Sequence, residues 1–164
     1  MTISDDGEKR AKQYQSDKRL ELESCLGAGT QGSVYLFNSP SRSQRVAVKL
    51  HERDEAYVRE RNVYLRLRDL KIHEVHGHEV PQLGNFDDRL LAIEMTIVSP
   101  PFVLDFGGAY LDRPPDYTPE IWADWRAMKS AAFESNWPAV QKILTEFESY
   151  GIFIADVNPA NIQF

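Results

Sequence analysis

The sequence predicts an α+β fold in which a β-rich N-terminal part precedes a helical C-terminal part. Between residues 20 and 51, apolar and polar side chains alternate in short runs separated by turn residues, which is typical of consecutive antiparallel strands. Residues 54–70 change to a helical period. Residues 118–151 contain two further helical stretches, and the second has its apolar residues on one face.

Each element of the β-rich part has its own signal. The stretch "LELESCL" alternates from Leu20, and "SVYLFN" from Ser33 is rich in β-branched and aromatic residues. A turn cluster, "SPSRSQ", separates them from "RVAVKLH" at 45–51. The helix after Asp54 carries an apolar stripe opposite Arg and Glu. Two more strands are expected, at Gln82–Phe86 and in "LLAIEMTIV" from Leu90.

The C-terminal part has clear helix boundaries. Thr118 is the expected cap of a helix at 120–134, since a proline and an acid follow it. The second helix covers "NWPAVQKILTEFESY", and Gly151 is its expected end. The last stretch, "IFIADVNPANIQF", predicts a short strand, a turn with proline and the start of another strand.

These elements predict four parts of the chain. Residues 1–17 are polar and are expected to be a frayed tail or a loosely held helix. Residues 18–98 form the β-rich lobe. Residues 99–117 are a Pro-rich connection, and residues 118–164 form a partial helical lobe.

Composition limits the classes of function. The 164 residues carry a net charge of −6, which disfavours nucleic acid as a partner but leaves room for one nucleotide in a local basic pocket. No apolar run reaches the roughly 18 residues that a membrane helix needs, and the start has no secretory signal. The one cysteine, Cys25, is expected to be a buried small hydrophobe. We therefore expect a cytoplasmic protein without membrane association.

A glycine motif stands between the first two predicted strands. Gly27, Gly29, Gly32 and Val34 fit the pattern G-x-G-x-x-G-x-V. Glycines let the main chain approach a phosphate closely and leave amide groups free to point at it. Because a strand follows rather than a helix, the context favours a hairpin that covers a nucleotide. The alternative is a tight hairpin without a ligand.

Two further pairs of residues are candidates for ligand binding or catalysis. Lys49 ends the apolar run "VAVK", and Glu60 on the following helix is placed to form an ion pair with it; otherwise Lys49 extends from an edge strand into solvent. Asp156 and Asn161 lie five residues apart across a turn with proline. A carboxylate and an amide on one loop can bind a hydroxyl proton and a metal ion, although each alone is common turn chemistry.

The order of these motifs resembles the protein-kinase-like superfamily. The resemblance covers about Leu20 to Phe164. It implies an antiparallel β N-lobe with one helix and a short, incomplete helical C-lobe. It also implies ATP and Mg²⁺ as cofactors, with a protein or a small molecule as substrate.

The resemblance assigns a role to each matching position. The three motif glycines would cover the ATP phosphates, and Lys49 would pair with those phosphates and with Glu60. The main chain from Glu94 to Thr96 would be the hinge that binds adenine. Asp156 would be the catalytic base, and Asn161 would be a magnesium ligand.

This sequence departs from the family pattern at several positions. Ile154 and Ala155 stand where the family has His and Arg, and Asn158 replaces a common lysine. The sequence ends three residues after Asn161, so no metal-binding Asp-Phe-Gly follows the catalytic segment. The chain is expected to be either a minimal kinase-like protein or a truncated one. A pseudokinase that binds nucleotide without turnover, and an interaction module that binds none, are the alternatives.

An Asp-Phe-Gly triplet does occur, at Asp105-Phe106-Gly107, but it precedes Asp156. Its expected role is a connecting loop with Phe106 packed and the glycines turning the chain. The alternative is that Asp105 contacts ribose or replaces the missing metal ligand.

Two smaller signals remain. His73, His76 and His78 are expected to lie in a structural loop, with a metal site as the alternative. Trp122, Trp125 and Met128 recur along one side of a predicted helix and are expected to belong to the core. The alternative is that they form an uncovered surface for a partner, or for a homo-oligomer formed through the C-terminal helices.

Overall fold

The computed structural model describes residues 5–164, and these form two compact units. Unit 1 contains the described residues up to Arg68 together with Pro81–Ile97, and unit 2 contains Asp69–Val80 and Val98–Phe164. The predicted α+β class with an antiparallel sheet is confirmed. The division differs from the predicted one because the N-terminal residues belong to unit 1, whereas Asp69–Val80 and the Pro-rich connection belong to unit 2.

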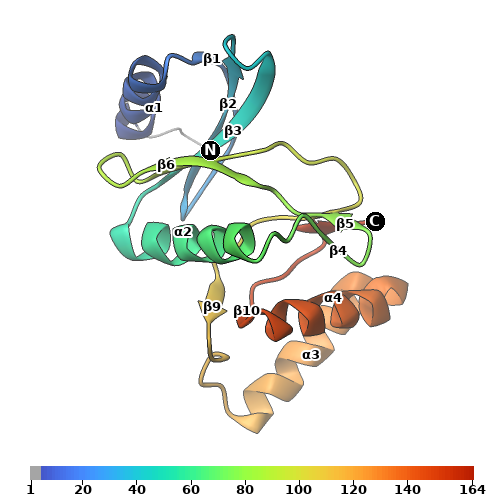
Figure 1. Cartoon of the computed structure of the whole chain (residues 1–164). Coiled ribbons are helices and arrows are strands. Elements are labelled where there is room, and N and C mark those ends of the chain that lie inside the picture. Colours follow the sequence, from blue (N-terminus) through green and yellow to red (C-terminus); the bar gives the residue numbers. More distant parts are fainter. Residues whose placement is uncertain (1–4) are drawn as a thin grey trace. The chain divides into compact units, whose positions relative to one another are not determined.

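Unit 1 is built on a five-stranded antiparallel sheet in the order β1-β2-β3-β7-β6 (Figure 1). The first three strands are consecutive along the chain, as predicted from their alternation and turns. The bounds of its elements are α1 Asp5–Lys18, β1 Glu21–Gly29, β2 Gly32–Ser39, β3 Gln44–His51, α2 Asp54–Asp69, β6 Leu83–Asp87 and β7 Ala92–Met95.

The register of this sheet sorts its side chains onto two faces. Tyr35, Val48 and Glu94 are directly opposite one another on β2, β3 and β7, so they share one face. Val34 and Lys49 are likewise opposite one another and share the other face. Helix α1 packs on the first face, and α2 contributes a partner to Lys49 on the second.

Helix α1 is an integral part of unit 1. This differs from the frayed tail or loosely held helix predicted for residues 1–17, of which residues 1–4 lie outside the described part of the chain. Ala11 and Tyr14 are fully buried and join the core cluster on the sheet. The Tyr14 hydroxyl donates to Oε2 of Glu94 at 3.0 Å, and Arg10 donates to the carbonyl oxygen of His51 at 2.8 Å. The sequence did not predict this packing, because most residues of the helix are polar and only a few of them contact the sheet.

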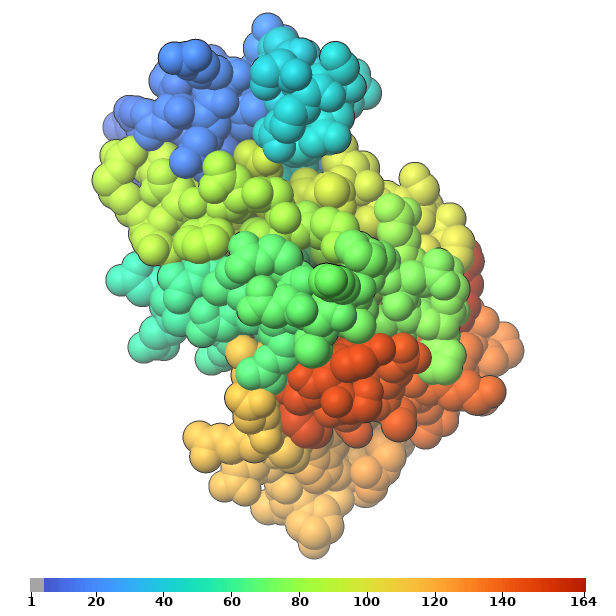
Figure 2. All heavy atoms as spheres, in the orientation of Figure 1, coloured from blue at the N-terminus to red at the C-terminus, as the bar shows by residue number. Residues whose placement is uncertain are grey.

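Unit 2 combines two helices with short strands. Its sheets have the orders β11-β8-β5-β4 and β10-β9. Figure 2 shows β4 and β5 (green) against α4 (red-orange). The bounds are β4 Glu74–Val75, β5 His78–Glu79, β8 Phe102–Val103, β9 Ala109–Leu111, α3 Pro119–Phe133, a 3₁₀ turn Glu134–Asn136, α4 Trp137–Ser149, β10 Ile152–Ile154 and β11 Ile162–Gln163.

The two helices of unit 2 begin and end close to the predicted positions. Oγ1 of Thr118 accepts the amide hydrogen of Ile121, which confirms the predicted cap of α3. Gly151 has a φ of 72° just after α4, a conformation that glycine adopts without strain. The predicted apolar face of α4 is the buried one; it consists of Val140, Ile143, Leu144 and Phe147. Within residues 5–164, no helix combines the length and apolar character needed to cross a membrane.

Candidate functional site

Lys49 and Glu60 form an ion pair in unit 1. The Lys49 Nζ atom lies 2.7 Å from Oε2 of Glu60, and the two side chains are 9% and 1% exposed. Strand β3 provides the lysine and helix α2 provides the glutamate. Two buried charges require good mutual geometry to offset their loss of hydration, so this pair fixes the direction of the Lys49 side chain.

His51 is a second partner of Glu60. Its Nε2 lies 2.7 Å from the same Oε2 atom, and its Nδ1 lies 3.2 Å from the carbonyl oxygen of Leu91. Both ring nitrogens therefore lie within hydrogen-bond distance of an oxygen atom. Sequence reasoning missed this residue. The available signal was its position two residues after Lys49 in a strand, which places both side chains on one face.

The carboxyl group of Glu60 is held in its charged form by these partners. Burial alone would raise the pKa of Glu60, but the Lys49 ammonium and the hydrogen bond with His51 outweigh it and lower that pKa below its ordinary value. A carboxylate that stays ionised can keep Lys49 in place over a wide range of pH.

The glycine motif forms the β1–β2 hairpin, and its glycines have different surroundings. Gly27, Val34 and Lys49 are opposite one another on three neighbouring strands, so the hairpin and the lysine share a sheet face. A β-carbon on Gly27 or Gly29 would meet no atom within 4 Å. Gly32 has a φ of 149°, and a β-carbon there would overlap the carbonyl oxygen of Leu50. Gly32 is thus needed for the hairpin itself, whereas Gly27 and Gly29 leave open space above it.

Glu94 and Thr96, the predicted hinge residues, use several of their groups inside unit 1. The buried Glu94 carboxylate accepts hydrogen bonds from Tyr14 and from Arg42, the latter at 2.9 Å. The Thr96 amide donates to the carbonyl oxygen of Gln82 at 2.9 Å, and Oγ1 of Thr96 accepts from the Gln82 amide at 2.8 Å. An adenine contact through the Thr96 amide would have to replace the first of these bonds. The role of this segment stays a prediction.

Asp156 and Asn161 lie in unit 2, on the loop that joins β10 to β11. The indole nitrogen of Trp125 donates to the carbonyl oxygen of Ala155 at 2.6 Å and holds the start of this loop against α3. The amide of Asn161 donates to the carbonyl oxygen of Asn158 at 2.9 Å, and Oδ1 of Asn158 accepts the amide of Ala160 at 2.9 Å. Asn158 therefore organises the turn on which Asn161 is presented.

The triplet Asp105-Phe106-Gly107 belongs to the same unit. Phe106 is fully buried, and its ring packs against Phe147 with centroids 5.6 Å apart, so the predicted packing of Phe106 is observed. Asp105 is half-buried, has a φ of 67°, and accepts the amide of Gly107 on Oδ1 at 3.2 Å. A β-carbon on the next glycine, Gly108, would overlap the carboxyl group of Asp156.

Two of the three histidines, His76 and His78, have protein partners for their rings. Nε2 of His76 lies 2.9 Å from Oε2 of Glu146, and Nδ1 of His78 lies 3.0 Å from the carbonyl oxygen of His76. Within residues 5–164, no group of three or more His, Cys, Asp or Glu side chains is arranged to hold a metal ion. Cys25 is half-buried and packs against the core of unit 1.

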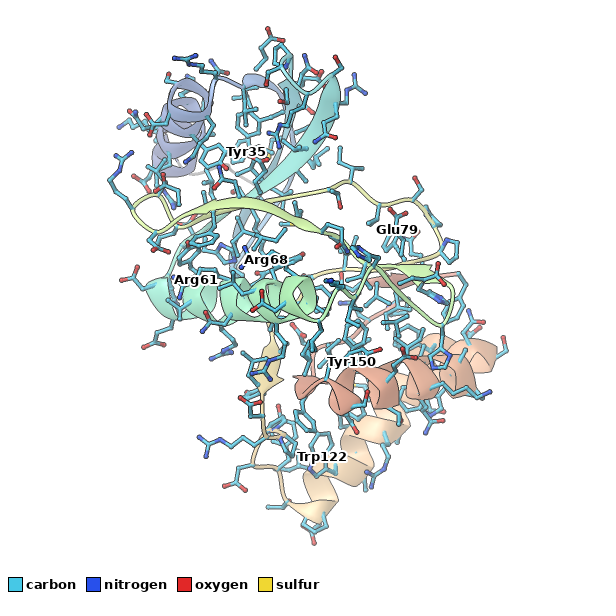
Figure 3. All side chains as sticks on the ribbon, viewed as in Figure 1. Tyr35, Arg61, Arg68, Glu79, Trp122 and Tyr150 are labelled. Atoms are coloured by element: carbon cyan, nitrogen blue, oxygen red, sulfur yellow. The ribbon has the colours of Figure 1, made fainter. Side chains whose placement is uncertain are left out.

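The tryptophan stripe lines a cavity within unit 2. The rings of Trp122 and Trp125 meet edge to face at 5.5 Å, and Met128 is 59% exposed. Figure 3 shows Trp122 near the start of α3. The adjoining cavity measures about 380 Å³ and has Arg126 in its wall. The predicted core position is therefore wrong for Met128, whereas Trp122 and Trp125 are half-buried. Self-association through this stripe stays a prediction.

No protein-family model and no curated protein matches the chain.

Proposed function

We propose that this chain is an ATP-binding, protein-kinase-like phosphotransferase that transfers the γ-phosphoryl group to a hydroxyl. The observation that carries the proposal is the buried ion pair of Lys49 and Glu60, aligned across the sheet with Val34 and Gly27 of the glycine hairpin. A lysine so fixed suits the α- and β-phosphates of a nucleotide.

The residues of unit 1 would bind the nucleotide. The Lys49 ammonium would donate to phosphate oxygens, and Glu60 with His51 would hold it in that direction. The open surroundings of Gly27 and Gly29 would let main-chain amides approach the phosphates without steric conflict.

The residues of unit 2 would serve the acceptor hydroxyl. The Asp156 carboxylate would accept the proton of the attacking hydroxyl, and its position is fixed by the loop that Trp125 and Asn158 organise. The amide oxygen of Asn161 suits a hard cation, which prefers oxygen ligands. A bound magnesium ion would neutralise charge on the phosphates.

Thermal unfolding with and without magnesium ATP tests nucleotide binding. The expected result is a rise in melting temperature for the wild-type chain, because a ligand that binds only the folded state stabilises it. Lys49→Met should lose most of this rise. Lys9→Met, which removes an exposed lysine of α1, is the matched control and should keep it.

Transfer is then measured with γ-labelled ATP as ATP turnover and as label on candidate acceptors. Asp156→Asn should abolish turnover and keep the thermal shift, whereas Asp124→Asn on the exposed side of α3 should keep both. An unchanged melting temperature in the wild type would exclude nucleotide binding. A thermal shift without turnover would replace the phosphotransferase by a pseudokinase.

A further inference from the structure

Two loops of unit 2 that are far apart in the sequence are joined side by side at both ends. Strand β8 pairs antiparallel with β11, with Val103 opposite Ile162. Strand β9 pairs antiparallel with β10, with Ala109 opposite Ile154. The loop 104–108 connects β8 to β9, and the loop 155–161 connects β10 to β11. The two loops therefore run in opposite directions between the same two pairs of strands.

Specific contacts close this arrangement at each end. The amide of Leu104 donates to the carbonyl oxygen of Asn161 at 2.9 Å. At the other end, Gly108 lies against the carboxyl group of Asp156, in space that any larger residue would fill. Asp105 follows Leu104 directly, and successive Cα atoms are about 3.8 Å apart. The Asp105 main chain therefore lies one residue from the contact with Asn161.

We propose that Asp105 and Asn161 together provide the side-chain oxygen ligands of the magnesium ion used in the proposed phosphotransfer. The inference rests on the proposed function. In the kinase-like superfamily an Asp-Phe-Gly triplet after the catalytic segment supplies the metal-binding aspartate. In this chain the triplet precedes the segment with Asp156 and Asn161 in the sequence. The strand pairs β8–β11 and β9–β10 nevertheless place the triplet beside the loop 155–161.

The donor set fits magnesium. A carboxylate and an amide oxygen are hard ligands, and magnesium commonly takes one or two protein oxygens while water and substrate phosphates complete its octahedron. Such a site needs no group of three acidic or histidine side chains. The absence of such a group among the described residues is therefore compatible with it.

The anchoring of the triplet suits a ligand that must be held still. Phe106 is fully buried against Phe147 of α4, and its carbonyl oxygen accepts the amide of Ala109 at 3.0 Å. The residue after Asp105 is therefore fixed in the core of unit 2, while Asp105 itself stays half-buried beside the catalytic loop. A rigid neighbour reduces the entropy that a metal ligand loses on binding.

Manganese binding in the presence of a non-hydrolysable ATP analogue tests the proposal without requiring turnover. Manganese is paramagnetic, so the electron paramagnetic resonance signal of the free ion gives the concentration of unbound manganese, and the bound fraction follows from it. Asp105→Asn is the informative variant, because asparagine keeps the acceptor for the Gly107 amide and tolerates a positive φ. Asp124→Asn removes one exposed charge from the same unit and is the matched control.

We expect Asp105→Asn and Asn161→Ala each to weaken manganese binding at least about tenfold, since even outer partners of metal ligands contribute that much. Circular dichroism and the melting temperature without ligand verify that each variant is folded. If Asp105→Asn does not fold, Asp105→Ser is tested in its place. Wild-type manganese affinity in a folded Asp105 variant would overturn the inference and leave the proposed function standing. A wild-type chain that binds neither the analogue nor manganese would overturn both.

Discussion

Gly108 lies so close to the Asp156 carboxyl group that a β-carbon at position 108 would overlap it. We expect Gly108→Ala to displace this carboxyl group and to lower the free energy of unfolding by about 1–3 kcal/mol, the usual cost of overpacking. Denaturant unfolding measures this. In an Asp156→Ala background the same substitution should cost much less. An equal cost in both backgrounds would contradict the contact.

The ion pair of Lys49 and Glu60 should show strong energetic coupling. Lys49→Met leaves the buried Glu60 carboxylate with His51 as a neighbour, and we expect a loss of about 3 kcal/mol in unfolding free energy. Adding Glu60→Gln removes that carboxylate, so the double variant should be more stable than the two separate losses predict. A double-mutant cycle measures the coupling, and strict additivity would exclude it.

The glycines of the hairpin should differ in whether their substitution affects stability or nucleotide binding. Gly32→Ala should destabilise the chain by about 2 kcal/mol, because its β-carbon meets the Leu50 carbonyl and its φ is unfavourable. Gly29→Ala should change the unfolding free energy by less than about 0.5 kcal/mol, since nothing lies nearby. It should instead weaken the thermal shift by magnesium ATP. A Gly29→Ala protein with normal nucleotide affinity would contradict the predicted approach of phosphates to this glycine.

Acid should remove the contribution of Glu60 to stability. Its pKa is lowered in the folded chain, so the unfolded chain takes up the proton first as the pH falls. The contribution is complete above the ordinary pKa of 4.5 and is lost as the pH falls from there through the lowered value. Unfolding free energies at a series of pH values should therefore decline less steeply in Glu60→Gln than in the wild type. Parallel curves would refute this assignment.

Helix α1 should behave as part of the core of unit 1. Tyr14→Phe removes the hydroxyl that donates to the buried Glu94 carboxylate and should cost about 1–2 kcal/mol. Tyr14→Ala also empties a fully buried position and should cost about 3–5 kcal/mol. Chemical denaturation measures both values. Wild-type stability in Tyr14→Ala would show that the helix is dispensable.

The sequence predicted the long elements well because their signals are local. The alternation of β1 to β3 and the cap at Thr118 need no knowledge of the rest of the chain. Pairing between distant segments was harder to predict. Strands β8 and β11 have two residues each, too few to show any period, so the neighbourhood of Asp105 and Asn161 was not visible. The partner role of His51 was also missed, since it depends on the tertiary placement of Glu60.

The hydrogen bond from Leu104 to Asn161 closes a long chain loop that contains both helices of unit 2. Closing such a loop costs conformational entropy, and burial of the apolar face of α4 helps to offset it. We therefore expect unfolding of these helices to destabilise the loop that carries Asp105. An ion bound at this loop would stabilise it and should slow the exchange of amide protons with solvent in α3 and α4. Hydrogen exchange in these two helices would therefore report on binding of the ion.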